Sequence, residues 1–203
     1  MKDVYFITGI GTDVGKTVVS AILVEAMQAD YWKPVQAGDL RNSDTMKVEN
    51  MVSNAVSTFH EEGYKLTKPM SPHAAAERDN VEIRIEALKL PETENTLVIE
   101  GAGGLMVPLN NNHLIIDLID HFDAKVILVS QNYLGSINHT LLSYEVLTNK
   151  EIPIEGIVFN GPSNPETEKY ILEYTGLPCL LRVNKEEKIT KEVIKKYADL
   201  WGK

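Results

Sequence analysis

Cysteine, aromatic residues and basic residues are all scarce in this chain of 203 amino acids. The single cysteine, Cys179, excludes an intrachain disulfide framework and a cysteine-based metal site within one chain. Aspartate and glutamate number 29 against 20 lysines and arginines, which gives a formal net charge of −9. Such an acidic chain is poorly suited to bind nucleic acid or an anionic membrane, although local positive charge can still bind a small phosphate compound.

Long hydrophobic segments are also lacking. No apolar run approaches the roughly 20 residues that cross a bilayer, and the apolar stretch at residues 4–8 is too short for a signal peptide. A chain with one cysteine suits a reducing compartment. We therefore expect a cytoplasmic protein with no membrane partner and no nucleic-acid partner.

Short apolar runs alternate with longer amphipathic segments along the chain. Five runs have the composition of buried strands, at residues 4–8, 31–35, 97–99, 125–130 and 154–159. Two longer segments have helical spacing, at residues 17–29 and 137–148, the second with an apolar face of Ile137, Leu141, Leu142 and Tyr144. This alternation predicts an α/β fold, a single domain over residues 1–203, with a parallel sheet covered by helices on both faces.

Two parts of the chain are less regular. Residues 42–91 are expected to hold one or two helices and loops, and residues 184–203 a solvated helix that contacts the body through Ile189, Val193 and Leu200. In a parallel sheet, ligands bind outside the carboxyl ends of the strands. We therefore expect the polar and glycine-rich segments after the strands to meet at one edge, namely residues 9–17, 36–44, 100–104 and 160–162.

A glycine-rich segment, Gly9-Ile-Gly-Thr-Asp-Val-Gly-Lys-Thr17, follows the first predicted strand and opens the first predicted helix. Glycines allow a tight turn whose N–H groups face a phosphate, and the positive end of the helix points at the same anion. Lys16 can reach the β- and γ-phosphates, and Thr17 can offer a hydroxyl to Mg²⁺. The segment predicts a P-loop NTPase-like fold, but kinases, GTPases, ATPases and ligases all use such a loop.

A second lysine and two carboxylates are candidates for the same site. Lys33 precedes Pro34, which keeps the backbone extended; its ammonium would point into the anion site, or else be exposed beside a turn. Glu100 ends the third apolar run, where burial of a carboxylate is costly unless a partner such as Mg²⁺ compensates. Asp44 could complete a magnesium set with Thr17 and Glu100. Composition alone favours a helix cap at Asp44 or the residue before it.

Two further polar segments have both a functional and an ordinary structural interpretation. Asn160 ends the last predicted strand, where its amide could bind the N6/N7 edge of adenine or form an Asn-Gly turn with Gly161. Gly135 to Asn138 precede a helix whose N-terminal amides could bind a carboxylate. On its own, Ser136 is better interpreted as a helix cap.

Taken together, these segments resemble the dethiobiotin synthetase family, which uses ATP to close the ureido ring late in biotin synthesis. The matching pieces are the loop from Gly9 to Thr17, Tyr31-Trp-Lys-Pro-Val-Gln-Ala-Gly38, Arg41-Asn-Ser-Asp44, Ser71-Pro-His73, Val98-Ile-Glu-Gly-Ala-Gly-Gly104 and Leu134-Gly-Ser-Ile-Asn-His139. Several positions differ from the family pattern; among them, Ala37 stands where the family commonly has a hydroxyl residue that touches substrate, and Gly161 where some members have an acidic residue.

The resemblance implies a magnesium- and ATP-dependent cyclo-ligase that acts as a homodimer. In that reaction, 7,8-diaminononanoate takes up CO₂ to give a carbamate, and the carbamate oxygen attacks the γ-phosphate of ATP. The second amine then displaces phosphate and closes the cyclic urea. The partners implied are therefore small molecules and a second copy of the chain.

The same resemblance implies a role for each matching residue. Lys16, Lys33 and Thr12 would stabilise the carbamate and the phosphoryl group, and Thr17, Asp44 and Glu100 would hold Mg²⁺. ATP would be bound by Asp13, Val14, Gly15, Lys16, Thr17, Val18, Asp44, Glu100, Gly101, Ala102 and Gly103, with adenine at Asn160 and Gly161. The diamine substrate would be bound by Lys33 and, across the dimer interface, by Gly135, Ser136, Ile137 and Asn138.

A P-loop ATPase of the nucleotide-switch or amidotransferase type is the alternative, because it would share the loop and the fold. Such switches often carry an extra lysine early in the loop, whereas residues 10–14 here are Ile-Gly-Thr-Asp-Val. An amidotransferase needs a glutaminase domain, for which this length leaves no room and only Cys179 could serve. The sequence therefore favours the cyclo-ligase.

Overall fold

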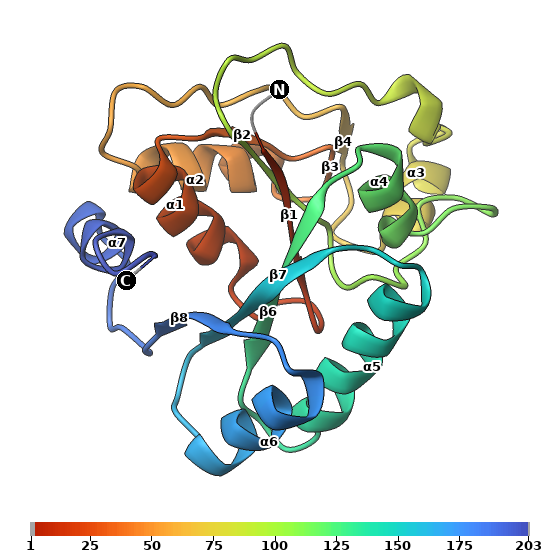
Figure 1. Cartoon of the computed structure of the whole chain (residues 1–203). Helices are drawn as coiled ribbons and strands as arrows, with labels where there is room; N and C mark the ends of the chain where they lie inside the picture. Colours follow the sequence, from red (N-terminus) through yellow and green to blue (C-terminus); the bar gives the residue numbers. More distant parts are fainter. Residues whose placement is uncertain (1–2, 203) are drawn as a thin grey trace.

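A computed structural model describes residues 3–202, and its centre is a parallel sheet (Figure 1). The strands of this sheet are β1 (Val4–Gly9), β2 (Asp30–Trp32), β5 (Leu97–Glu100), β6 (Lys125–Gln131), β7 (Ile154–Asn160) and β8 (Cys179–Val183). They pair in the order β2-β5-β1-β6-β7-β8, and every pairing is parallel. A second sheet pairs β3 (Val35–Ala37) with β4 (Tyr64–Leu66), also in parallel.

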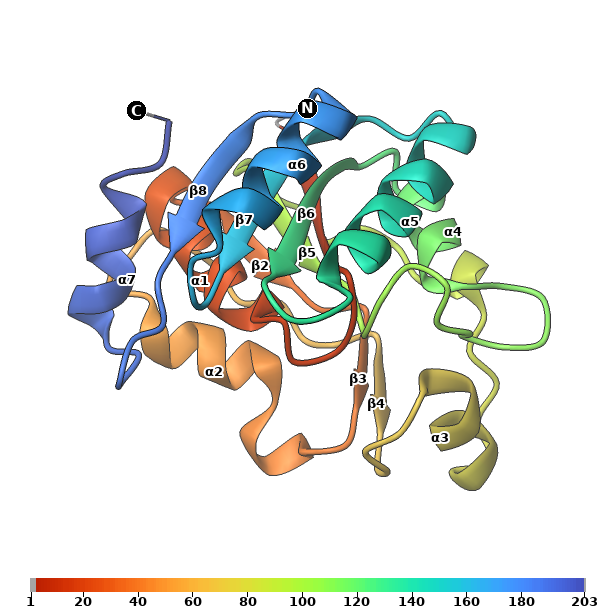
Figure 2. The ribbon, with the colours of Figure 1, turned by 90° about the horizontal axis from the view of Figure 1, so that it is seen from below.

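Helices cover both faces of the main sheet (Figures 1 and 2). One layer contains α1 (Lys16–Met27), α2 (Asp44–Met51) and α7 (Lys191–Ala198). The other contains α4 (Ile115–His121), α5 (Ser136–Asn149) and α6 (Pro165–Thr175), while α3 (Pro72–Arg78) lies beside the small sheet. The predicted α/β class, with helices on both faces of a parallel sheet, is therefore confirmed. Within residues 3–202, no helix is both long enough and apolar enough to span a bilayer.

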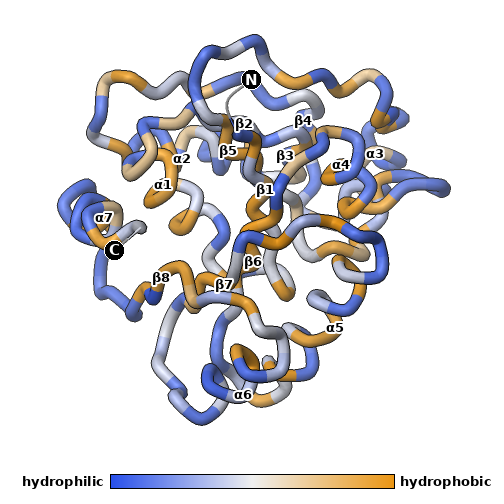
Figure 3. The backbone as a smooth tube through the Cα atoms, in the orientation of Figure 1, coloured by the Kyte–Doolittle hydropathy of each residue, from blue (hydrophilic) through white to orange (hydrophobic). Residues whose placement is uncertain are grey.

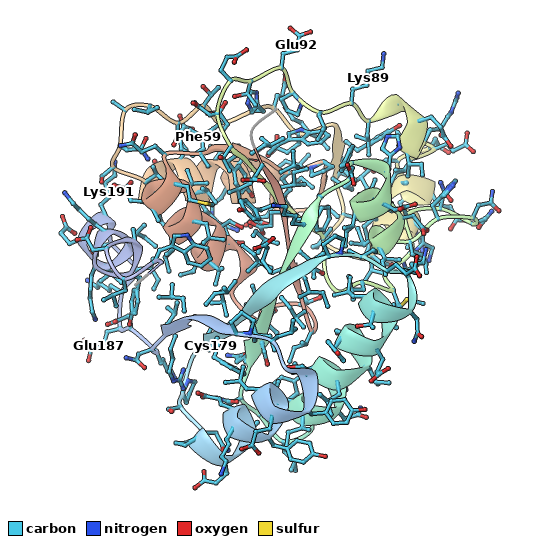
Figure 4. All side chains as sticks on the ribbon, viewed as in Figure 1. Phe59, Lys89, Glu92, Cys179, Glu187 and Lys191 are labelled. Atoms are coloured by element: carbon cyan, nitrogen blue, oxygen red, sulfur yellow. The ribbon has the colours of Figure 1, made fainter. Side chains whose placement is uncertain are left out.

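Two hydrophobic cores lie on opposite faces of the sheet. Successive side chains of a strand point to opposite faces, so that Phe6 belongs to one core and Ile7 to the other. The same alternation divides Leu128 from Val129 on β6. In Figure 3, hydrophobic residues gather along the central strands, and hydrophilic residues predominate in the outer segments. In Figure 4, the labelled Lys89, Glu92 and Lys191 point outward from the periphery. Burial on both faces explains why the strands are continuous apolar runs in the sequence.

The strand predicted at residues 31–35 is wrong in extent. β2 ends at Trp32, and β3 begins at Val35 in the second sheet, so that Lys33 and Pro34 lie between the two sheets. Proline has no N–H to donate to a strand ladder, which is a physical reason for the chain to leave the main sheet at this point. As a result, Lys33 sits beyond the end of β2 rather than inside a strand.

The predicted apolar face of residues 137–148 is right only in part, since Ile137 packs against the core as predicted. Leu142 is 56% exposed, whereas Thr140 and Leu147 are buried against the sheet. Thr140 tolerates burial because its hydroxyl donates to the Ser136 carbonyl at 2.7 Å and pairs with the Ser130 hydroxyl at 2.9 Å. Hydropathy alone could not place this satisfied threonine in the core.

The C-terminal segment forms a shorter helix than predicted, and different residues anchor it. Ile194 and Tyr197 of α7 are buried, whereas Ile189 and Leu200 are 36% and 49% exposed because both lie outside the helix. Of the three predicted anchors, only Val193 packs against the core. The elements α4, α6 and β8 were not predicted. α6 is mostly polar, and β8 is a short strand of five residues with an arginine in it.

Candidate functional site

The loop between β1 and α1 forms a tight backbone turn that requires glycine. Gly15 has φ +93°, and a Cβ on this residue would lie 2.0 Å from Asn160 Nδ2. The same Asn160 amide donates to the Val14 carbonyl at 2.9 Å, which ties the end of β7 to the loop. A Cβ on Gly9 would lie 2.5 Å from the Val14 side chain. The helix begins at Lys16, so that its N-terminal amides face the turn, as the sequence predicts.

A cleft of about 680 Å³ lies beside this loop. Most of the residues predicted to act on ATP line it. They lie at or after the ends of β1, β2 and β5, or stand at the starts of α1 and α2: Thr12, Asp13, Gly15, Lys16, Thr17, Lys33, Asp44, Glu100, Ala102 and Gly103. The expectation that segments 9–17, 36–44 and 100–104 meet at one edge of the sheet is confirmed.

Lys33 is the centre of the charge network in this cleft. Its Nζ lies 2.7 Å from Asp44 Oδ2 and 3.1 Å from Glu100 Oε1, and only 4% of the residue is exposed. Burial by itself would lower the pKa of Lys33, but the two carboxylates outweigh it and raise the pKa above the usual value. The alternative of an exposed lysine is therefore wrong.

Glu100 is buried at the end of β5 and uses both oxygens. Oε1 accepts hydrogen bonds from Thr17 Oγ1 at 2.9 Å and from Lys33 Nζ at 3.1 Å. Oε2 accepts a hydrogen bond from the Tyr31 hydroxyl at 3.0 Å. These hydrogen bonds and the ion pair compensate the free-energy cost of burying the Glu100 carboxylate, a cost that the sequence analysis predicts.

Asp44 does not act as the helix cap. Ser43 caps α2, because its hydroxyl accepts from Met46 N at 3.4 Å, and this leaves the Asp44 carboxylate free to pair with lysines. Lys47 Nζ lies 3.2 Å from Asp44 Oδ1, opposite the contact with Lys33. Burial opposes ionisation of Asp44, but Lys33 and then Lys47 lower its pKa below the usual value. Asp44 is thus an anion held between two ammonium groups.

Lys16 is the first residue of α1, directly after the turn. Its Nζ donates to the Gly11 carbonyl at 2.8 Å. Burial lowers the pKa of Lys16 to about 8, and the positive charge of Lys33 acts in the same direction, against the attraction of Glu100 and Asp44. The charged form of such a poorly solvated ammonium is stabilised when an anion such as a phosphate approaches it.

Several predicted residues lie outside the cleft. Val14, Val18 and Gly101 do not line it, and Asn160 and Gly161 stand behind the loop, where Gly161 N donates to the Val183 carbonyl. The candidate carboxylate-binding residues line a second cavity, of about 740 Å³, between the starts of α5 and α6: Gly135, Ile137 and Asn138. Ser136 is buried next to them, and its hydroxyl has no hydrogen-bond partner among residues 3–202.

The cleft contains a small number of oxygen ligands suited to Mg²⁺. In the part of the chain that the structure describes, no group of three or more His, Cys, Asp or Glu residues is placed to hold a metal ion. The predicted set offers two carboxylates and one hydroxyl, of which Thr17 and Glu100 are already 2.9 Å apart. A magnesium ion that keeps several waters needs only one or two protein carboxylates, so these residues fit the ion.

Three residues of the site were not identified from the sequence. Lys47 pairs with Asp44, Tyr31 donates to Glu100, and Gln36 Oε1 accepts from Asp44 N at 3.2 Å. The (i, i+3) spacing from Asp44 could have indicated Lys47, since such residues are neighbours on a helix. Tyr31 stands in an apolar run and gave no such signal.

Comparisons with known proteins find relatives that match almost the full chain. A family model described as an AAA domain matches residues 3–193. An ATP-dependent dethiobiotin synthetase from Cytophaga hutchinsonii is 56% identical over 195 residues, which cover 96% of this chain and 94% of the relative. One from Christiangramia forsetii is 55% identical and covers 100% of this chain and 98% of the relative. The chain belongs to the dethiobiotin synthetase family.

Solved structures of other proteins are similar to this family member in fold. The septum site-determining protein MinD of Pyrococcus horikoshii OT3 matches with a TM-score of 0.63 and 13% identity, covering 98% of this chain and 96% of that one. A ParA family ATPase from Chlorobium tepidum matches with a TM-score of 0.57 and 13% identity, covering 98% and 92%. At this identity the matches show the P-loop NTPase fold alone. The switch-type alternative is not favoured, because the full-length identity lies with dethiobiotin synthetases.

Proposed function

We propose that this protein is an ATP-dependent cyclo-ligase that converts 7,8-diaminononanoate, CO₂ and ATP into dethiobiotin, ADP and phosphate. The observation that carries the proposal is the position of Lys33, which is buried in the cleft beside the phosphate-binding loop. The chain that contains this cleft belongs to the dethiobiotin synthetase family. A buried ammonium at this place suits a reaction in which one anion attacks another, because neutralising their repulsion is the main electrostatic requirement.

The first step forms an N–C bond between one amine of the substrate and CO₂, and a proton leaves the nitrogen. The carbamate oxygen then attacks the γ-phosphorus of ATP, the bond to the β-phosphate oxygen breaks, and ADP leaves. Attack of the second amine on the carbamate carbon expels phosphate and closes the cyclic urea. Lys33, Lys16 and Thr12, which share one cleft, would stabilise the negative charge of the carbamate and of the transferring phosphoryl group.

Magnesium would be held by Thr17, Asp44 and Glu100. Bound Mg²⁺ would neutralise charge on the terminal phosphates of ATP. The Nζ of Lys33 contacts both carboxylates, so a magnesium ion bound by Asp44 and Glu100 would take over part of these contacts. The ammonium of Lys33 would then be able to turn toward the carbamate. The phosphates themselves would be held by the backbone from Asp13 to Val18 and by Gly101, Ala102 and Gly103.

The remaining contacts of the reaction are proposed from the family resemblance. Asn160, with Gly161, would bind adenine from behind the loop. Gly135 to Asn138 would bind the substrate carboxylate at the site of a second subunit, which agrees with their place in a separate cavity. The protein would therefore act as a homodimer of one-domain chains, in the cytoplasm.

A turnover assay tests the proposal. ADP release should require both bicarbonate and 7,8-diaminononanoate, and dethiobiotin should appear in a 1:1 ratio with phosphate. ATP hydrolysis that proceeds at the same rate without the diamine would instead identify a nucleotide-switch ATPase.

A further inference from the structure

Tyr31 contacts the site described above, although it does not line the cleft. Its hydroxyl donates to Glu100 Oε2 at 3.0 Å, and the side chain is fully buried. The two residues come from the adjacent strands β2 and β5, which are labelled side by side in Figure 3. In the register of these strands, Tyr31 pairs with Val98. The hydrogen bond therefore reaches the carboxylate from inside the fold.

The position of Tyr31 is fixed by contacts on several sides. Its N–H donates to the Thr58 carbonyl at 2.9 Å, and its carbonyl accepts from His60 N at 2.9 Å. The ring of Phe59 packs against the ring of Tyr31 with centroids 6.5 Å apart. Because β2 is hydrogen-bonded on its other side to β5, the backbone of Tyr31 is held on both edges.

The phenol acts only as a donor in this contact. A phenol hydroxyl has one proton to donate, and this hydroxyl lies 3.0 Å from Glu100 Oε2. An ionised carboxylate can only accept hydrogen bonds. The direction of the bond is thus set by the chemistry of both groups.

This bond makes the two oxygens of Glu100 unequal. Among residues 3–202, Tyr31 is the side chain that bonds Oε2, whereas Thr17 and Lys33 both bond Oε1. A carboxylate is planar, so that anchoring one oxygen fixes the direction of the other. Oε1 is therefore directed at the hydroxyl and the ammonium of the cleft.

We propose that Tyr31 is a positioning residue, which holds Glu100 so that Oε1 alone faces the bound metal and nucleotide. The inference rests on the proposed role of Glu100 in holding Mg²⁺. Without the hydroxyl, Oε2 is left buried and without a partner, which is unfavourable. The carboxylate would then turn to satisfy Oε2 at the expense of Oε1.

The substitution Tyr31→Phe tests this role, because it removes one oxygen and keeps the ring. Mn²⁺, used in place of Mg²⁺ with ADP and followed by electron paramagnetic resonance, should bind about three- to tenfold more weakly, the effect of one lost hydrogen bond. The matched control is Tyr174→Phe, which removes a tyrosine hydroxyl that donates to Glu145 at 3.1 Å on the surface. That variant should bind Mn²⁺ like the unmodified protein.

A purely structural role for Tyr31 predicts a lower melting temperature with Mn²⁺ affinity within twofold of the unmodified protein, and that result would overturn the inference. Glu100→Gln separates the two proposals. Unchanged Mn²⁺ binding in Glu100→Gln refutes the magnesium role of Glu100 itself. Weaker binding in Glu100→Gln but not in Tyr31→Phe refutes the positioning role alone.

If Tyr31→Phe does not fold, a crystal structure of the unmodified protein with Mg²⁺ and ADP tests the positioning role of Tyr31 instead. The inference requires Oε2 of Glu100 to stay within hydrogen-bond distance of the Tyr31 hydroxyl while Oε1 faces the ion or one of its waters. A carboxylate turned with Oε2 toward the ion, away from Tyr31, overturns it.

Discussion

Substitution of Lys33 by methionine should separate catalysis from nucleotide binding. Methionine keeps the unbranched stem and removes the ammonium that lies 2.7 Å from Asp44 and 3.1 Å from Glu100. Two carboxylates are then left near each other in a buried site. Removing one partner of a buried ion pair costs about 3–5 kcal/mol. For a chain of this size, a loss of 1 kcal/mol lowers the melting temperature by about 2–4 °C, so that a decrease of roughly 6–20 °C is expected.

The pH dependence of this loss has a defined sign. Asp44 has a lowered pKa, so that its ion pair stabilises the native protein above the unfolded pKa of 3.8 and is lost as pH falls through the lower, folded value. Lys33 has a raised pKa, so that its contribution is complete below the unfolded pKa of 10.5 and is lost as pH rises through the raised, folded value. In Lys33→Met a carboxylate should take up a proton, and the deficit in melting temperature should shrink between pH 7 and pH 5.

Thermal unfolding and steady-state turnover measure the two effects. Turnover should fall about 10²- to 10³-fold, the usual effect of removing one stabilising group from a developing charge, while ADP affinity stays largely unchanged. The control is Lys150→Met, which removes a surface ion pair with Asp117 worth at most about 1 kcal/mol. Loss of ADP affinity in parallel with turnover would refute the reasoning, since it would make Lys33 a nucleotide-binding residue.

Other predictions concern the loop and the edge of the sheet. Burial lowers the pKa of Lys16 to about 8, so binding of ADP at pH 8 should be accompanied by uptake of a proton on Lys16. Calorimetry in buffers of different ionisation enthalpy measures this proton uptake. Binding without proton uptake would contradict the role of Lys16 at the phosphates. Gly15→Ala should lose nucleotide binding, since its Cβ would lie 2.0 Å from the Asn160 amide. Gly176→Ala, with φ +66° and open space, should lose only stability by strain of about 1–2 kcal/mol. Burial opposes ionisation of Asp30, but hydrogen bonds from two loops lower its pKa below 3.8. Asp30→Ala should therefore lower the melting temperature at pH 7, and this loss should shrink as pH falls through the lowered pKa. An equal loss at pH 7 and in acid would contradict this.

The strands and the phosphate loop could be predicted because their signals are local. A strand buried on both faces is a continuous apolar run, and a glycine-rich turn before a helix is itself a sequence pattern. The break at Pro34 was visible as a proline, but its consequence, a second sheet formed by β3 and β4, depends on pairing with residues 64–66, which are distant in the sequence.

The partners within the site could be predicted only in part. Lys33 and Glu100 were identified because a charge at the end of an apolar run is unusual. Their contact with each other, and the role of Asp44 as a carboxylate between two lysines rather than a cap, depend on how β2, β5 and α2 pack. Tyr31 could not be identified, because its ring satisfies the pattern of a core strand and only its hydroxyl reaches the site.

The transfer of oxygen from CO₂ to phosphate tests the central claim most directly. If the carbamate oxygen attacks ATP, one oxygen that entered as CO₂ leaves in inorganic phosphate. Single turnover with C¹⁸O₂, 7,8-diaminononanoate and unlabelled ATP should therefore give phosphate with one ¹⁸O atom for each dethiobiotin formed. Dethiobiotin formed together with unlabelled phosphate would contradict the account.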